Sequence, residues 1–394
     1  MSTRTVLVAM SGGVDSSVAA ARLLAAGHRV VGAYMSNGVK SGDGPRGSQG
    51  CCGIDDAEDA RRVSDRLGIP FYAVDLEDAF GDLIDAFVDA YRNGRTPNPC
   101  IECNRRFKFG RLLALAREIG AESVATGHYA RVVRRDGRSG IARGSDAGKD
   151  QAYVLFSLGE EARARAEFPL ADMTKAEVRR EAAALGLPVA DKPESMEICF
   201  VPSGDYRDVV RERAPDAFRK GRIVTVDGEH LGEHDGYAGY TIGQRKRLPG
   251  GAGEPRFVTR IDPETATVFV GRRDDLLVRA FRVTRPVWHL ADPEASSFRG
   301  AVQVRHRHAP EPCTVTREGD GFLVTPDAPM ASVTPGQAAV VFDGDAVLVG
   351  GWIEDAVADA WHPWPDSCCS PPPSPRCSRP RAPIEVSSPV PRSR

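Results

Sequence analysis

Residues 6–17 read VLVAMSGGVDSS, an apolar run followed by a Gly-Gly turn and a serine-containing segment. The apolar run predicts a buried strand over 6–10, and the Ala- and Leu-rich residues 17–27 predict a helix that ends at a glycine. Gly12 and Gly13 let a ligand approach the backbone closely, and the turn lies at the positive N-terminus of the helix. The unit therefore predicts a phosphate-binding loop.

The spacing within this loop excludes two common phosphate-binding motifs. A Walker A loop needs a lysine after its last glycine, and a dinucleotide fingerprint needs GxGxxG; neither is present here. SGGVDS directly after an N-terminal strand instead resembles the PP-loop of ATP pyrophosphatases, which cleave ATP between the α and β phosphates. The resemblance implies that ATP binds here with Mg2+, and that Asp15 orients the loop or the metal ion on the phosphates.

The composition is that of a multi-domain globular protein. The chain has 394 residues, 41% of them hydrophobic, which is enough for two or three packed domains. Its net charge is −2, so a nucleic-acid partner has to be bound by local basic patches. The sequence begins without a leader-like apolar run and contains no apolar stretch of about 18 residues, so we expect a cytoplasmic protein with no membrane partner. In that compartment the nine cysteines are expected to be mostly reduced.

Strand and helix patterns alternate after the first helix. The expected strands cover 28–35, 69–76 and 121–133, and the expected helices cover 55–67 and 79–91. This order predicts an α/β fold, with a parallel sheet between helices and a nucleotide at the carboxyl ends of the strands. Gly127 and His128 would close one such strand, next to the nucleotide and the substrate.

Two cysteines in the sequence CIEC, Cys100 and Cys103, stand where a helix is expected to begin. A helix N-terminus lowers the pKa of a thiol, and the residues that follow are basic: Arg105, Arg106 and Lys108. Cys199 is a third candidate thiol. Such cysteines suit sulfur transfer, in which a persulfide attacks an adenylated carbon, AMP leaves, and a second thiol resolves the sulfur as a disulfide.

Seven separated motifs are together similar to those of the tRNA-specific 2-thiouridylases, and they occur in the order of that family: SGGVDSS, TPNPCIECNRRFKFG, ATGHYAR, GKDQAYVLF, PLADMTKAEVR, ESMEICFVP and YTIGQRKRLPG. The resemblance covers residues 4 to about 355. It implies a sulfurtransferase that adenylates O2 of the wobble uridine of tRNA and then transfers sulfur to C2. The products would be 2-thiouridine, AMP and pyrophosphate, and the sulfur donor would be a cysteine desulfurase or a relay carrier.

The same resemblance implies roles for individual residues. Cys103 would be the nucleophile and Cys199 the persulfide carrier. The implied ATP-binding residues are Ala9, Met10, Ser11, Gly12, Gly13, Val14, Asp15, Ser16, Met35 and Gly127. The implied tRNA-binding residues are Asn98, Pro99, Cys100, His128, Lys149, Asp150, Gln151, Arg305, His306 and Gln337.

Position 100 departs from the family pattern. Well-known members have an aspartate in TPNPD, where this chain has Cys100. Cys100, Cys103 and Cys199 would then be three convergent thiols, which suits a [4Fe-4S] cluster with one open iron. The cluster and the persulfide remain two competing descriptions of the same cysteines.

The later sequence is rich in short β runs separated by glycines, which predicts a small β-rich module and then a β-barrel. The expected parts are a PP-loop catalytic domain (1–205), a central tRNA-contacting domain (206–279), a C-terminal β-barrel (280–358) and a disordered Pro/Ser/Arg-rich tail (359–394). Basic residues at 131–143, 245–247 and 305–308 support an RNA-binding surface. The participation of Cys51 and Cys52 stays open.

Two other functions remain as alternatives. Another PP-loop ligase or amidase would adenylate a small molecule and would need no paired cysteines. A non-catalytic iron-sulfur or RNA-binding protein would have a decayed nucleotide site, which the intact SGGVDS sequence argues against.

Overall fold

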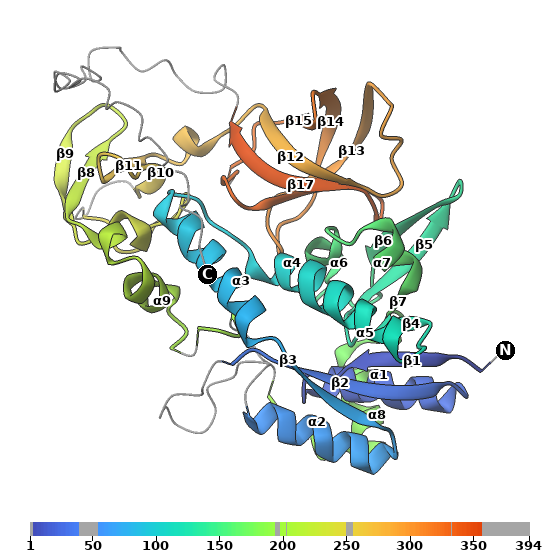
Figure 1. The fold of residues 1–394 in the computed structure, drawn as a ribbon. Helices are drawn as coiled ribbons and strands as arrows, with labels where there is room; N and C mark the ends of the chain where they lie inside the picture. Colours follow the sequence, from blue (N-terminus) through green and yellow to red (C-terminus); the bar gives the residue numbers. More distant parts are fainter. Residues whose placement is uncertain are drawn as a thin grey trace, which may run out of the picture.

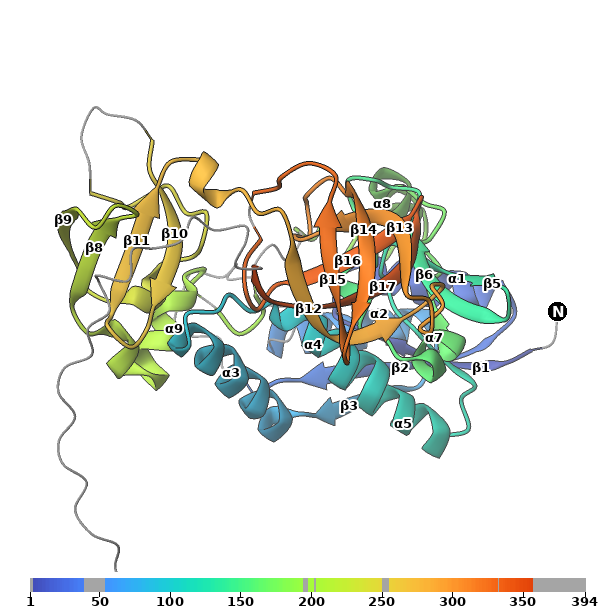
Figure 2. The same cartoon turned by 90° about the horizontal axis from the view of Figure 1, so that it is seen from above.

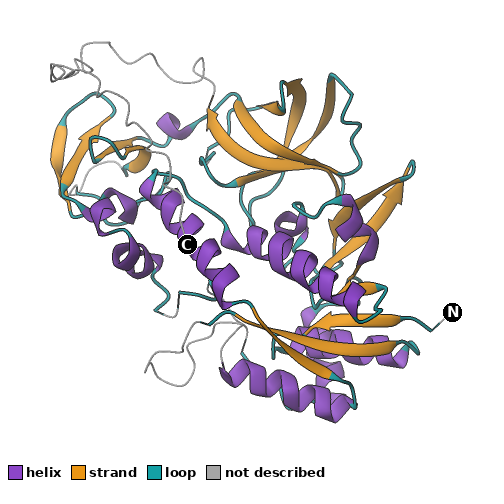
Figure 3. Cartoon of the chain, viewed as in Figure 1, coloured by secondary structure: helices purple, strands orange, loops and turns teal. Residues whose placement is uncertain are grey.

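The computed structural model describes residues 3–38, 54–193, 198–201, 203–249, 255–331 and 333–356. The expectations for Cys51 and Cys52, and for the tail 359–394, lie outside the described residues. The described part forms three β-sheets with helices gathered mainly around the first of them (Figures 1 and 3). No helix in the described ranges is both long and apolar enough to cross a membrane.

The first sheet is parallel and has the strand order β3-β2-β1-β4-β7. Its strands are β1 (Thr5–Ala9), β2 (Arg29–Ser36), β3 (Phe71–Asp75), β4 (Ser123–Ala125) and β7 (Ala166–Glu167). The chain runs outward from β1 in one direction to β3 and then returns to place β4 on the other side of β1. The carboxyl ends of β1 and β4 therefore flank a switch point, where ligands bind in sheets of this type.

Helices cover both faces of this sheet because β1 is buried on both sides. Val6 and Val8 pack with α1 (Val14–Ala25), α2 (Ile54–Leu67) and α8 (Lys175–Ala184). Leu7 and Ala9 point to the other face, where they join a core built by α3 (Glu77–Arg92) and α5 (Leu112–Glu118). The predicted α/β fold is confirmed. Helix α1 begins at Val14 rather than at residue 17, because Gly13 is its N-cap.

The single strand expected over 121–133 is wrong. Strand β4 ends at Ala125, and the chain then leaves the first sheet, because the backbone at Gly127 packs against Asp15. It continues as the hairpin of β5 (Ala130–Arg135) and β6 (Arg138–Arg143), which belongs to another sheet.

That other sheet closes into the predicted C-terminal barrel. Its strands are β12 (Phe281–Trp288), β13 (Ser297–Gln303), β14 (Glu311–Glu318), β15 (Gly321–Pro326), β16 (Ala338–Asp343) and β17 (Ala346–Ala356). Pairing of β12 with β17 closes the ring, and β17 also pairs with β6 at Ala346 and Ala142. The hairpin from the first half of the chain therefore extends the barrel sheet.

Two buried polar side chains strengthen this junction. The guanidinium of Arg163, in α7 (Glu160–Arg165), donates to the carbonyl oxygens of Ser139, Leu158 and Trp288. The imidazole of His289 accepts a hydrogen bond from the amide of Ile141 at 3.1 Å through Nδ1, and its Nε2 donates to the carbonyl oxygen of Phe156 at 2.7 Å. These bonds fix the position of the barrel relative to the parallel sheet.

A third sheet lies at the far end of the molecule from the parallel sheet (Figure 2). It consists of β8 (Gly221–Thr225), β9 (His230–His234), β10 (Phe257–Asp262) and β11 (Thr267–Gly271), in the order β10-β11-β8-β9. This is the small β-rich module expected from the sequence. The remaining helical segments are α4 (Pro99–Cys103), η1 (Asn104–Arg111), α6 (Ala152–Leu155), α9 (Tyr206–Arg213), η2 (Pro215–Phe218), η3 (Tyr237–Gly239) and η4 (Asp274–Leu276).

Candidate active site

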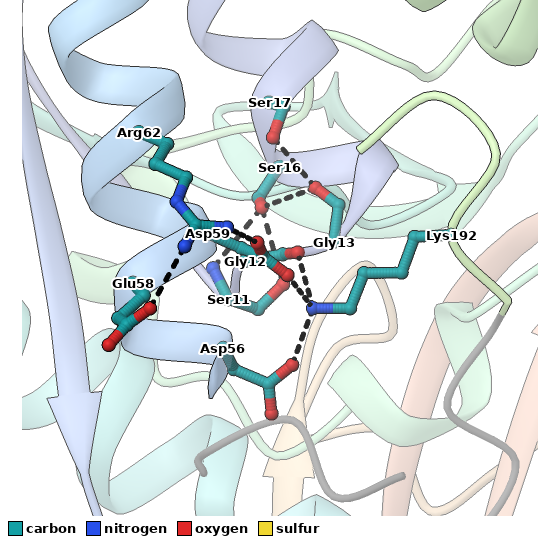
Figure 4. A network of polar contacts seen from close by, with 10 residues as sticks. All are labelled: Ser11, Gly12, Gly13, Ser16, Ser17, Asp56, Glu58, Asp59, Arg62 and Lys192. Carbon is teal, nitrogen blue, oxygen red and sulfur yellow. Dashed lines mark hydrogen bonds and ion pairs between the residues drawn. The ribbon is translucent and has the colours of Figure 1, made fainter. Parts of the chain in front are cut away.

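The PP-loop (Ser11–Ser16) joins β1 to α1 and is braced by its own serines. The amide of Ser11 donates to Ser16 Oγ at 3.2 Å, and the hydroxyl of Ser17 donates to the Gly13 carbonyl oxygen at 2.8 Å. Gly12 has a φ of +68°, and a Cβ at this position would collide with the carbonyl oxygen of Asp56 in α2. Only glycine fits there, which explains the close turn (Figure 4).

Asp15 is held from two sides. The Nζ of Lys175 lies 2.7 Å from each of its carboxylate oxygens, and the hydroxyl of Tyr129 donates to Oδ1 at 2.8 Å. Lys175 is the first residue of α8, whose start is fixed by a capping box between Thr174 and Glu177. The loop after β1 is therefore tied to two segments that lie far from it in the sequence.

Lys192 forms a second link to the same loop. Its Nζ lies 3.0 Å from the Gly12 carbonyl oxygen, 2.7 Å from Asp56 Oδ1 and 2.6 Å from Asp59 Oδ2. Burial lowers the pKa of Lys192, but the two carboxylates outweigh that effect, so its pKa lies above the usual value. Figure 4 shows the ammonium between the loop and α2.

A cavity of about 740 Å³, here called the large cavity, opens beside the PP-loop. Three parts of the chain line it: the loop with Lys175 and Lys192, the segment 147–151, and the barrel residues 303 and 306–309. Of the residues expected to bind ATP or tRNA, it is lined by Ser11, Gly13, Val14, Asp15, Lys149, Asp150, Gln151 and His306.

A second cavity of about 180 Å³, the small cavity, adjoins the other side of the loop. Ser11, Asp15 and Gln151 line both cavities, so the two meet at the PP-loop. The other residues lining the small cavity are Ala9, Met10, Ser16, Met35, Cys103, Lys108, Thr126, Gly127 and His128. The fold thus brings Cys103 beside the residues expected to bind the nucleotide.

His128 is a neutral base in the small cavity. Its Nδ1 lies 2.7 Å from Thr126 Oγ1, and its Nε2 lies 3.4 Å from the Nζ of Lys108. An ammonium group can only donate, so Nε2 accepts from Lys108 and Nδ1 carries the proton that bonds Thr126. Burial and, to a smaller extent, the charge of Lys108 hold the pKa of His128 well below its usual value.

Helix α4 places the cysteine pair. The side chain of Asn98 caps the helix by accepting from the amide of Cys100 at 3.2 Å. Cys100 is exposed, whereas Cys103, on the last turn, is half-buried and reaches the small cavity. The chain then continues as the π-helix η1, a geometry that often marks functional sites.

Three comparisons with known proteins bear on this site. A family model described as "tRNA methyl transferase HUP domain" matches residues 4–203, which is more than half of the chain. Models described as "tRNA methyl transferase PRC-barrel domain" and "Aminomethyltransferase beta-barrel domain" match residues 207–272 and 278–353.

Curated relatives match over nearly their whole length. The chain is 44% identical over 385 residues to a tRNA-specific 2-thiouridylase MnmA of Rhodopirellula baltica, covering 89% of this chain and 96% of the relative. It is 48% identical over 351 residues to one of Chloroflexus aurantiacus, covering 88% and 98%. The chain belongs to the tRNA-specific 2-thiouridylase family. A solved 4-thiouridine synthetase–RNA complex with bound ATP has 20% identity, a TM-score of 0.34 and coverage of 54% and 51%, which is too distant to add to this assignment.

For a 2-thiouridylase family member, the position of Cys199 is the main departure from expectation. Cys199 is half-buried and packs against the same core as Cys103, but it is not among the described residues that line either cavity. Its neighbour Phe200 packs edge-on against Phe87 of α3, with ring centroids 5.1 Å apart, which holds this segment on α3. The structure does not bring Cys199 into the small cavity.

The three-cysteine metal site is not formed in this conformation. Across the described ranges, no group of three Cys, His, Asp or Glu side chains is placed to hold a metal ion. Cys100, Cys103 and Cys199 all lie in those ranges and outside any disulfide. These residues therefore do not fit a [4Fe-4S] cluster as they stand here.

The basic residues after Cys103 were expected to act together on the thiols, and this expectation is wrong for two of them. Arg105 pairs with Glu102 at 2.5 Å, as the i,i+3 spacing on one helix allows, and Arg106 pairs with Asp82 at 3.6 Å. Lys108 is the one of the three that lines the small cavity with Cys103.

The residues expected to contact tRNA fall into two groups. His128, Lys149, Asp150, Gln151 and His306 line the cavities, although the carboxylate of Asp150 is used internally by Arg143 and by two backbone amides. The others lie elsewhere: Asn98, Pro99, Cys100, Arg305 and Gln337.

Contacts to neighbouring segments hold two residues of the second group. Arg305 donates to the Ile242 carbonyl oxygen and to Thr334 Oγ1, both at 3.0 Å. Gln337 follows Gly336, whose backbone packs on Thr96, so its loop lies beside the segment that leads into α4.

Several arginines of the basic run at 131–143 also have internal partners. Arg131, Arg135 and Arg138 form ion pairs with Asp172, Asp343 and Asp292, at 2.9, 2.6 and 3.4 Å. These pairs join the hairpin to the barrel and to the loop before α8, which weakens the expectation of an RNA-binding surface there.

Sequence reasoning missed four residues of the site: Tyr129, Arg143, Lys175 and Lys192. Tyr129 and Lys175 lie inside motifs that were noticed, ATGHYAR and PLADMTKAEVR, and Lys192 lies two residues before ESMEICFVP. Each contact partner of Lys175 and Lys192 is more than 100 residues away along the chain or belongs to another element. Motif position was the available signal; the role depends on the fold.

Proposed function

We propose that this chain catalyses the ATP-dependent 2-thiolation of the wobble uridine of tRNA in the cytoplasm. One observation supports the proposal above the others: Ser11 and Asp15 of the PP-loop and the thiol of Cys103 line one cavity. A small-molecule ligase would adenylate its substrate without needing a thiol at that place. The two adjoining cavities suit a reaction that activates a base with ATP and then delivers sulfur to it.

The first half-reaction takes place at the PP-loop. Backbone amides at the start of α1 and the positive helix end bind the phosphates, and Met35 and Gly127 bound the nucleotide on the side of the small cavity. The uridine O2 attacks the α-phosphorus, the bond to the β-phosphate oxygen breaks, and pyrophosphate leaves with the electron pair. AMP is then attached to O2, which makes C2 electrophilic.

The donor set fits Mg2+ because Asp15, a hard oxygen ligand, lines both cavities at the loop, and Mg2+ needs only one or two carboxylates in addition to phosphate oxygens. When bound there, the ion would neutralise charge on the phosphates. Asp15 would hold it while Tyr129 and Lys175 keep the carboxylate oriented.

The second half-reaction uses the two cysteines. The terminal sulfur of a Cys199 persulfide, loaded by a sulfur donor protein, attacks C2 and AMP leaves. The Cys103 thiolate then attacks Cys199 Sγ, forming a Cys103–Cys199 disulfide and releasing 2-thiouridine; an external thiol reduces the disulfide. Because Cys199 does not line the small cavity, this step requires its segment to move away from α3.

The tRNA would be held by more than one part of the chain. Lys149, His306 and the neighbouring barrel residues line the large cavity, while Asn98 to Cys100 present the start of α4 to the target base. We retain the division into domains 1–205, 206–279 and 280–358, with the β5–β6 hairpin shared between the first domain and the barrel.

Pyrophosphate exchange and thiolation test the proposal together. Purified protein is incubated with labelled pyrophosphate, ATP and unmodified tRNA, and 2-thiouridine is measured by mass spectrometry after adding a sulfur donor and a thiol reductant. The proposal predicts exchange only in the presence of tRNA and formation of 2-thiouridine. Exchange without tRNA would indicate a small-molecule ligase, and no exchange at all would indicate a non-catalytic binding protein.

A further inference from the structure

The PP-loop contains no lysine, yet two ammonium groups from other segments line the large cavity beside it. Lys175 comes from the start of α8, and Lys192 from the segment that follows this helix. Their side chains are 12% and 27% exposed, so both charges are largely removed from solvent. Two part-buried cations next to a phosphate loop need a physical reason.

The two ammonium groups contact the loop at different places. Lys175 binds the carboxylate of Asp15, near the start of α1, and Lys192 binds the carbonyl oxygen of Gly12, at the tight turn. Neither lysine lines the small cavity, which contains Cys103. Both therefore lie on the side of the loop away from the thiol.

The position of the two cavities orders the phosphates along the loop. The reacting α-phosphorus has to lie near the cavity that holds Cys103, because C2 of the base becomes bonded to sulfur there. The β- and γ-phosphates then extend to the other side of the loop, into the large cavity, where Lys175 and Lys192 are.

Charge compensation favours the same arrangement. The N-terminus of α1 supplies only about half an elementary charge, which is too little for a part-buried triphosphate. Another cation of the large cavity, Arg143, is bound by Asp150, Gln303 and the face of the Phe342 ring. Lys175 and Lys192 are the cations in contact with the loop itself.

We propose that Lys175 and Lys192 bind the β- and γ-phosphates of ATP and hold the pyrophosphate as it leaves. In doing so each ammonium exchanges part of its contact with Asp15, or with Asp56 and Asp59, for phosphate oxygens. The breaking bond joins the α-phosphorus to the bridging oxygen, and the electron pair goes to the pyrophosphate that the lysines neutralise. This inference rests on the proposed function and adds to it the site of the leaving group.

Comparison of ATP with AMP separates this role from a structural one, because AMP lacks the two outer phosphates. Affinities for ATP, AMP and inorganic pyrophosphate are measured by calorimetry for the wild type, Lys175→Met and Lys192→Met. We expect each variant to lose roughly 10- to 100-fold in affinity for ATP and for pyrophosphate, the range of a charge-assisted contact, while AMP affinity is unchanged. Lys175→Arg and Lys192→Arg keep the charge and should recover part of the ATP affinity.

Arg62→Ala is the matched control for Lys192. Arg62 also binds Asp59, at 3.4 Å, but it does not line the large cavity. Its removal perturbs the same carboxylate and should leave ATP affinity unchanged.

An equal loss of ATP and AMP affinity in the Met variants, or no loss of either, would overturn the inference while leaving the proposed function intact. A wild-type protein that binds neither nucleotide would instead overturn both. Thermal melting of each variant shows whether it is folded, and a variant that does not fold is replaced by its Arg counterpart in the comparison.

Discussion

A Cβ at Gly127 would lie 2.6 Å from the carbonyl carbon of Asp15 and equally close to the Ser16 amide nitrogen. The chain after β4 and the PP-loop after β1 are therefore packed backbone against backbone. This contact sits at the switch point of the parallel sheet, between the carboxyl ends of its two adjacent strands. Any side chain at position 127 has to push the loop away from its present place.

Gly127→Ala should weaken ATP binding. Displacing the loop costs about 1–3 kcal/mol by the usual measure of overpacking, which corresponds to roughly 5- to 100-fold in affinity. Calorimetric titration with ATP measures the effect. Gly81→Ala is the control, since a Cβ at Gly81 in α3 meets nothing within 4 Å. Wild-type affinity in Gly127→Ala would show that the nucleotide does not use this loop position.

Cys103→Ser and Cys199→Ser should each abolish thiolation and leave tRNA binding nearly unchanged, because a hydroxyl cannot carry or resolve sulfane sulfur. Mass spectrometry of the tRNA product and a gel-shift titration measure the two properties. Cys100→Ser is the matched control on the same helix as Cys103. Full thiolation by either of the first two variants would disprove the sulfur-transfer roles given to these residues.

Cys100→Asp separates the persulfide from the iron-sulfur description. Since Cys100, Cys103 and Cys199 do not form a metal-binding group here, we expect anaerobically purified protein to contain little iron and Cys100→Asp to thiolate tRNA. Iron and labile sulfide are measured together with the visible spectrum. About four irons per chain, lost with activity in Cys100→Asp, would establish the three cysteines as ligands of a cluster.

His289 should make the junction of barrel and catalytic domain sensitive to acid. Burial lowers the pKa of His289 from 6.5 to about 3, so the native protein keeps it neutral while the unfolded chain takes up a proton below about pH 6.5. Its contribution is complete above pH 6.5 and decreases as the pH falls toward 3, by up to about 1.4 kcal/mol per pH unit.

Melting temperatures at pH 7 and pH 5 test this for the wild type and His289→Gln. Glutamine does not titrate, so the variant should be less stable at pH 7 and should lose less on acidification. His230→Gln, at an exposed position in β9, serves as the control and should follow the wild type. Equal losses in the wild type and His289→Gln would contradict the assignment of this acid sensitivity to His289.

Local sequence signals were sufficient where short-range physics decides the structure. The apolar run, the glycines at 12 and 13 and the Ala/Leu-rich helix predicted β1, the PP-loop and α1 within three residues. The same signals failed at 121–133, where β propensity continues but the contact between Gly127 and Asp15 turns the chain into the barrel sheet. Propensity along a segment cannot register a contact with a residue more than a hundred positions earlier.

The site shows the same limit. Its serines, glycines, Asp15 and Cys103 were identified from motifs, because the chemistry of a phosphate loop and of a thiol at a helix start is written in neighbouring residues. The cations were not: Arg105 and Arg106 looked suited to the thiols but form ion pairs with Glu102 and Asp82.

The sequence by itself determined the α/β class, the phosphate loop, the family and the residues that carry the chemistry, since these depend on periodicity and on the order of local motifs. Only the tertiary structure decided that the loop separates two cavities, that Cys103 lies in one and Lys175 and Lys192 in the other, and that Cys199 lies in neither. The reason is physical: Lys175 meets Asp15 across 160 residues and Lys192 meets Gly12 across 180, and such contacts exist only once the sheet and its helices have packed.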